Sequence, residues 1–215
     1  RAEPEPRPAG AALAAGARAL WRVPQLRAIT AATTASFVGI GGLTLTTVLV
    51  AAHLGDPNGA GPLLTVFALG ALAGSVLMTR LPTPPPPLRL ARWCLIALGA
   101  TLTMTALSPS YWLTLAGFAL AGLADGPLLG ATLRLRAEYA PPGTRAQVFT
   151  LGAALKISAA SLGAALIGLT GGLPAPVLLA GIGAVVLASA ALTRVGTRPS
   201  RSHTLVPATD PEENP

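Results

Sequence analysis

Two charged side chains lie deep inside apolar stretches, and they are the strongest candidates for chemistry in this sequence. Asp125 stands nine residues before Arg134, and Lys156 stands eleven residues after Arg145. If both stretches cross a bilayer as helices, both charges lie about 13–17 Å from the same membrane surface, because a helix rises ~1.5 Å per residue. A charge at a helix centre costs roughly 2.5–3.5 kcal/mol, which favours pairing of the two residues. Two interpretations follow: a fixed ion pair that orients the helices, or a titratable pair that lines a pathway.

Proline and threonine residues extend this candidate pathway. Pro127 follows Asp125 by two positions and removes a backbone hydrogen bond, so it predicts a kink that either helps to build a site or only shapes the bundle. Threonines recur at helical spacing in the first apolar stretch. Their hydroxyl groups either face a cavity or bond to their own helix backbone. The candidate substrate or proton pathway therefore comprises Asp125, Lys156, Pro127, Thr30, Thr34 and Thr44.

The composition and the placement of arginine indicate a membrane protein. The chain is 52% hydrophobic and 11% charged, whereas about a quarter of the residues in soluble domains are charged. Apolar stretches of membrane-spanning length are expected at residues 28–52, 62–79, 90–107, 111–133, 146–170 and 174–193. Every arginine precedes the first stretch, follows the last, or lies around the second and fourth connections. The other connections contain no Arg or Lys, which predicts six transmembrane helices with both termini in the cytoplasm.

Other classes of function are not expected from these residues. The net charge of +7 is spread over the connections instead of forming one phosphate-binding patch, so we expect no nucleic-acid partner. The two histidines lie at the end of the first stretch and in the tail, and no nucleophile or zinc motif occurs. We therefore expect no enzyme, no catalytic residue, no metal site and no cofactor.

The chain divides into three regions by composition. Residues 1–27 are expected to form a cytoplasmic linker, with a short helix near AALAAGARALWR. Residues 28–195 are expected to form the six-helix transmembrane bundle, and residues 196–215 a disordered cytoplasmic tail. The chain begins with Arg instead of Met, which indicates a piece of a longer polypeptide.

Internal similarity predicts that the bundle is built from two related units. Residues 66–71 match residues 148–153 at five of six positions, at an offset of 82 residues. Shorter matches relate the first span to the fourth at an offset of 81 and the third to the sixth at 84. Because each unit has three spans, the second unit inserts upside down relative to the first. The expected fold class is an all-α membrane protein of six transmembrane helices arranged as a 3+3 inverted repeat, with a site where the units face each other.

Three segments resemble the carboxyl-terminal half of bacterial major facilitator superfamily transporters. The segment GLADGPLLGATLRLRAEYAPPGTRAQVFTLGAALKISAASLG resembles the tenth and eleventh helices of that fold. WRVPQLRAIT resembles the entry to the seventh helix, and GALAGSVLMTR resembles the eighth helix. The resemblance covers roughly residues 20–195. It implies a twelve-helix secondary transporter of the bacterial plasma membrane, whose amino-terminal six helices are the partner of this chain. It also implies proton-coupled efflux of a small organic molecule by alternating access.

One connection departs from the pattern of the superfamily. The loop after the second span reads TRLPTPPPPLRLAR and lacks the acidic residue that the family often has there. A charge-relay gate is therefore not implied at this loop. The alternative function, from another class, is a stand-alone six-helix protein that pairs with a second copy as a channel or scaffold. An upstream coding segment with six more apolar spans would separate the two.

Cysteine labelling tests the topology that the arginines predict. In a Cys94→Ser background, we expect cysteines at Arg80, Arg145 and Arg198 to react from the cytoplasmic side, because cytoplasmic connections retain the cations. Cysteines at Asp56 and Ser110 should react only from outside. Labelling of Asp56→Cys and Arg145→Cys from the same side would contradict the topology.

Overall fold

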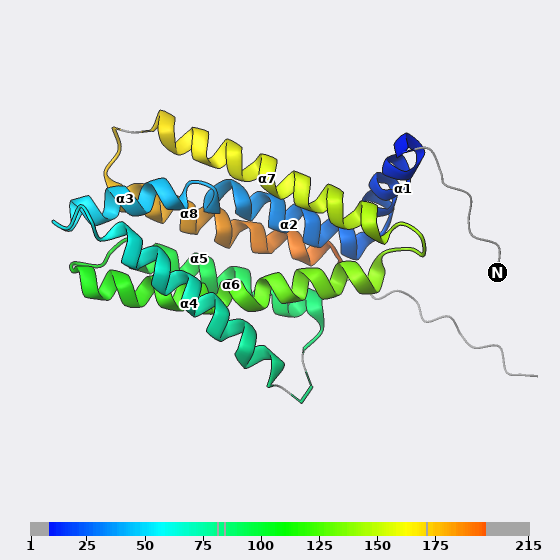
Figure 1. The fold of residues 1–215 in the computed structure, drawn as a ribbon, viewed down its shortest axis with the longest axis horizontal. Helices are drawn as coiled ribbons and strands as arrows, with labels where there is room; N and C mark the ends of the chain where they lie inside the picture. The colour runs from blue at the N-terminus through cyan, green and yellow to red at the C-terminus, as the bar shows by residue number, and fades with distance from the viewer. Residues whose placement is uncertain (1–8, 81, 84, 171, 197–215) are drawn as a thin grey trace, which may run out of the picture.

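The chain folds into a bundle of helices (Figure 1). The computed structural model describes residues 9–80, 82–83, 85–170 and 172–196. No strand occurs within these ranges, which confirms the all-α prediction. In chain order the elements are α1 (Ala9–Arg22), α2 (Pro24–Ile40), α3 (Leu43–His53), α4 (Ala60–Thr79), α5 (Pro87–Thr105), α6 (Tyr111–Tyr139), α7 (Arg145–Leu169), α8 (Ala175–Ser189) and the short 3-10 helix η1 (Ala190–Gly196).

Five helical segments are long and apolar enough to cross a membrane, and they indicate a membrane protein. They are Pro24–His53, which joins α2 to α3, then α4, α6 and α7, and finally Ala175–Arg194, which joins α8 to η1. The stretch predicted at 90–107 forms α5, which is not among these five. Arg89 and Arg92 lie in the first two turns of α5 and make that helix less apolar. Membrane-spanning length and apolarity are thus found for five of the six predicted spans.

The regions outside the bundle are described only in part. The predicted short helix near AALAAGARALWR is confirmed as α1, which packs against α7 and α2. The helix that follows begins at Pro24, with proline in its first turn, and so starts four residues before the predicted span. Residues 1–8 of the predicted linker and residues 197–215 of the predicted tail lie outside the described residues.

The helices form two packed groups (Figure 1). In one group, α6 packs against both α4 and α5. In the other, α2 packs against α7 and α8, and α3 packs against α8. The two groups meet mainly where α5 lies against α8. Although α6 and α7 are consecutive in the chain, they contact each other only slightly, because each belongs to a different group.

Glycines mark the closest approaches between helices. A Cβ added at Gly122 of α6 would collide with the backbone of Phe67 in α4, and one at Gly41 would collide with the backbone of Ala160 in α7. Small residues at such points let two backbones touch, which is the main packing device of membrane helices. Further backbone contacts of glycine are Gly70 on Ala119, Gly74 on Leu123, Gly126 on Ala71, Gly163 on Val38, and Gly99 and Gly183 on each other, whereas Gly42 meets the Ile167 side chain.

The connections at the two ends of the bundle differ in their chemistry. At the end without arginine, the Tyr111 hydroxyl donates a hydrogen bond to the Gly59 carbonyl at 2.9 Å and ties α6 to the first connection. At the other end, the turn between α6 and α7 contains Gly143 with φ 76°, a left-handed conformation that favours glycine. The connections that carry arginine lie toward this second end (Figure 1).

Alanine substitution tests the glycine contacts. We expect Gly122→Ala to lower the thermal stability of the purified chain, because the new methyl group meets the Phe67 carbonyl and overpacking costs about 1–3 kcal/mol. Gly130→Ala is the matched control in the same helix, since a Cβ there meets nothing within 4 Å. It should be neutral or slightly stabilising, because alanine favours helix by up to ~1 kcal/mol. Equal melting temperatures for the two variants would contradict the close contact.

Candidate functional site

A cavity of about 520 Å³ lies between α2, α6 and α7, and we call it the α6–α7 cavity. It forms where the two helix groups separate, next to the weak contact between α6 and α7. Its lining combines two cations with mostly apolar side chains. The lining residues are Phe37, Leu129, Leu133, Arg136, Phe149, Thr150, Ala153, Lys156 and Ile157.

Arg136 is the most unusual side chain of this cavity. It is only 3% exposed, and its Nε and Nη2 atoms are buried without any hydrogen-bond partner. The guanidinium group lies against Gly152 of α7, where a Cβ would collide with it. Arginine keeps its charge under all ordinary conditions, and a buried charge without a partner is costly. Arg136 is therefore a cation with unused donors at the edge of a cavity.

Lys156 supplies the second cation from the opposite helix. Its Nζ lies 4.1 Å from the centroid of the Phe37 ring, which is the distance of a cation–π contact. The ammonium group is attracted by Asp125 and repelled by Arg136. Lys156 also follows Gly152 by one helical turn, so the two residues share a face of α7.

The predicted partner of Lys156 lies nearby without touching it. Asp125 is partly buried in α6 and interacts electrostatically with Lys156. No ion pair within 4 Å joins these two side chains, and Asp125 does not line the α6–α7 cavity. Cys94 of α5 is also within electrostatic range of Asp125. Asp125 and Lys156 are thus close enough to attract each other, but the direct contact of Lys156 is with Phe37.

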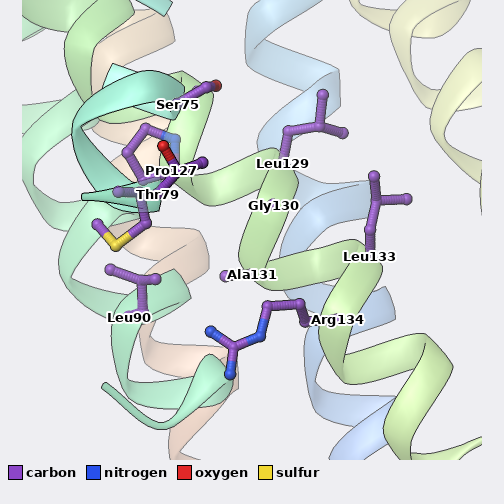
Figure 2. A pocket seen from close by; sticks show the side chains of 11 residues that line it. Ser75, Thr79, Leu90, Pro127, Leu129, Gly130, Ala131, Leu133 and Arg134 are labelled. Atoms are coloured by element: carbon purple, nitrogen blue, oxygen red, sulfur yellow. The ribbon is translucent and has the colours of Figure 1, made fainter. Parts of the chain in front are cut away.

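Pro127 lies on the other side of α6, in a separate cavity. This α4–α6 cavity has a volume of about 660 Å³ (Figure 2). Pro127, Ser75 and Thr79 line it, and the Arg134 side chain extends from α6 toward Leu90 of α5 (Figure 2). The helix continues through Pro127. The Leu123 carbonyl, which proline deprives of its helical donor, packs against Gly74 of α4. Pro127 therefore shapes the α4–α6 contact and does not share a cavity with Lys156.

The predicted threonines separate into two environments. Thr30 and Thr34 line a third cavity, of about 370 Å³, with residues of α1, α2 and α7. Their hydroxyl groups have no hydrogen-bond partner, whereas Thr33 donates to the Ile29 carbonyl of its own helix at 2.7 Å. Thr44 lies in α3, is exposed and lines none of these cavities. The six predicted residues are therefore not gathered in one site.

Sequence reasoning missed Arg136 because it ended the fourth span at residue 133 and assigned the following arginines to a connection. The structure corrects this assignment: α6 runs on to Tyr139, and both Arg134 and Arg136 belong to its last turns. The signal was the helical period. Eleven residues return a helix to nearly the same face, so Arg136 lies on the face of Asp125. Arg134 lies on a different face and is exposed.

The arrangement places two cations at one mostly apolar cavity. No group of three His, Cys, Asp or Glu side chains in the described ranges lies close enough to hold a metal ion. Comparisons of the chain with protein-family models, with curated proteins and with solved structures give no significant match.

A double-mutant cycle tests the coupling between Asp125 and Lys156. We expect Asp125→Asn to lower the thermal stability, because Lys156 then lacks the carboxylate that attracts it. Adding Lys156→Met to this variant should restore stability, with an interaction energy of about 0.5–3 kcal/mol. The control cycle combines Asp125→Asn with Arg134→Gln, whose exposed side chain should give additive effects. Additivity in the Asp125 and Lys156 cycle would show that the two residues do not interact.

Proposed function

We propose that this chain is the carboxyl-terminal six-helix half of a major facilitator superfamily transporter, in which α5 spans the membrane in addition to the five long apolar segments. It would export a small organic molecule by alternating access, with each export step coupled to the inward movement of protons. The observation that carries the proposal is an internal equivalence in how the helices pack. That equivalence is the one expected of a 3+3 inverted repeat.

The way the helices pair with one another supports this equivalence. We number the spans in chain order. The first is α2 with α3, the second α4, the third α5, the fourth α6, the fifth α7, and the sixth α8 with η1. The first span packs on the fifth and sixth, and the fourth packs on the second and third. Exchanging the first with the fourth, the second with the fifth and the third with the sixth leaves these pairings unchanged. The third and sixth spans, α5 and α8, pack on each other, as the exchange also requires.

The glycine contacts repeat this exchange residue by residue. Three of the four close glycine contacts between α4 and α6 have a counterpart between α7 and the first span, with offsets of 81 residues from the first span to α6 and 93 residues from α4 to α7. The fourth, Gly126 on Ala71, corresponds to Leu45 and Ala164 and has no glycine counterpart. The corresponding contacts are Gly122 on Phe67 with Gly41 on Ala160, Gly70 on Ala119 with Gly163 on Val38, and Gly74 on Leu123 with Gly42 on Ile167. Gly99 and Gly183, at an offset of 84, meet each other. These correspondences support an axis of internal symmetry near that contact.

The packing register differs from the sequence match at one pair of spans. The packing offsets of 81 and 84 residues are the same as the offsets of the corresponding sequence matches. For the second and fifth spans the two differ: the sequence match of residues 66–71 with 148–153 has an offset of 82, whereas the packing offset is 93, which is eleven residues more. Eleven residues are about three helical turns. Gly70 accordingly meets the Ala119 backbone, whereas Gly152 meets the Arg136 side chain. That sequence match therefore does not mark equivalent contacts.

The position of the α6–α7 cavity also supports a transporter. Substrate sites of secondary transporters lie at the interface of structural repeats, and ionisable residues within membrane helices mark substrate or ion routes by default. Arg136 and Lys156 face this cavity from two helices that belong to different groups. In the proposed complete protein, which would lie in the bacterial plasma membrane with both ends of this chain in the cytoplasm, the amino-terminal half would cover the cavity.

A flux assay tests the proposed function. Vesicles that contain the proposed complete polypeptide, with both six-helix halves, receive a pH gradient and a panel of small organic compounds. The dye pyranine reports the internal pH. We expect compound-dependent proton movement with that polypeptide and none with the 215-residue chain alone, because alternating access would need both halves. Saturable flux by the 215-residue chain alone would contradict the half-transporter proposal and favour a homodimeric channel.

A further inference from the structure

We propose that the α6–α7 cavity binds a small organic anion with an apolar body, and that Arg136 and Lys156 hold its anionic group. This inference gives the transported molecule a chemical class, and in that respect it rests on the proposed function. The binding site itself needs only the cavity and its two cations.

The unused donors of Arg136 are the first step. Its Nε and Nη2 atoms are buried and have no acceptor in the protein. A buried donor without a partner is destabilising, and more so when it is charged. A carboxylate presents two oxygens in the geometry that a guanidinium group matches with two parallel hydrogen bonds. Nη1 is not among these fully buried atoms, so an organic anion in the cavity would meet the guanidinium group there, and a rotation of the side chain would bring the buried donors to it as well.

The charge balance of the cavity is the second step. Arg136 and Lys156 repel each other, and no acidic residue is among the described side chains that line the cavity. The Phe37 ring supports the ammonium group of Lys156 through its π-face, but it carries no net charge. Asp125 attracts Lys156 from outside the lining. One bound anion would offset the repulsion between the two cations.

Gly152 provides the space that the Arg136 side chain occupies against α7. The Arg136 guanidinium lies where any larger side chain would be at residue 152. Lys156 lies one turn further along the same face of α7. The absence of a side chain at Gly152 thus lets the cation of α6 reach the face of α7 that carries Lys156.

The remaining lining defines the body of the ligand. Phe149, Ile157 and Leu129 present apolar surface, as do most of the other lining residues. The volume of about 520 Å³ falls within the range of roughly 300–1,000 Å³ of small-molecule sites. The cavity therefore fits an amphipathic anion, such as an aryl or alkyl carboxylate, better than a small inorganic ion.

Calorimetry on the purified 215-residue chain in neutral maltoside detergent tests this inference. The probe is 4-phenylbutyrate, and its neutral amide is the matched ligand control. We expect the carboxylate to bind and the amide to bind at least tenfold more weakly. Arg136→Gln and Lys156→Gln should each weaken carboxylate binding at least tenfold. Arg134→Gln removes an exposed cation two residues away and should leave the affinity unchanged.

Further arms separate the alternative outcomes. Equal affinity for the carboxylate and the amide, or unchanged affinity in both Arg136→Gln and Lys156→Gln, would overturn the proposal. A third result would also overturn the proposal. In it, the chain binds phosphatidylglycerol but not phosphatidylcholine, Lys156→Gln loses this binding, and the carboxylate does not bind; the cations would then hold a lipid headgroup. If Arg136→Gln does not fold, Lys156→Gln and the ligand comparison on the unmodified chain still decide. Because binding needs no flux, a failed flux assay with intact binding removes only the proposed transport.

Discussion

Close contact between helix backbones at glycine is the interaction on which the rest of this structure depends. Lipid tails are as apolar as leucine, so the hydrophobic effect does little to hold membrane helices together, and packing of small residues takes its place. Here Gly122 fixes α6 on α4, and Gly41 fixes the first span on α7. These contacts set the rotation of α6 and α7. They thereby determine that Arg136 and Lys156 face a common cavity.

Much of the fold was predictable from sequence, because apolar length and charge placement are strong signals in membrane proteins. The ends of the helices were less predictable where a polar residue is buried. Arg134 and Arg136 lower the local hydropathy and suggest that a span has ended, yet the buried face of α6 continues through Leu135 and Arg136. Hydropathy averages both faces of a helix, so it does not distinguish an exposed arginine from one that packs against a neighbouring glycine.

The candidate site was predictable only as a set of charged residues. Asp125 and Lys156 were singled out by their depth, and they do interact electrostatically. Their direct partners depend on contacts that depth does not reveal: Lys156 lies on Phe37, and Arg136 lies on Gly152. Packing also tells more than sequence matches do about the proposed repeat. A chain rich in Ala, Gly and Leu offers many chance matches, whereas a packing equivalence needs corresponding residues to be in contact twice.

The two cations of the α6–α7 cavity come from different helix groups, and this gives anion binding a mechanical consequence. Arg136 belongs to α6, which packs on α4 and α5, and Lys156 belongs to α7, which packs on the first span. Since α6 and α7 contact each other only slightly, few direct contacts hold the two groups together at this point. An anion bound by both cations would join the two helix groups there. When the anion leaves, the two cations would repel each other again. A ligand changes a conformational equilibrium only through different interactions with the two states, and a bridging anion supplies such a difference at the boundary where the helix groups separate.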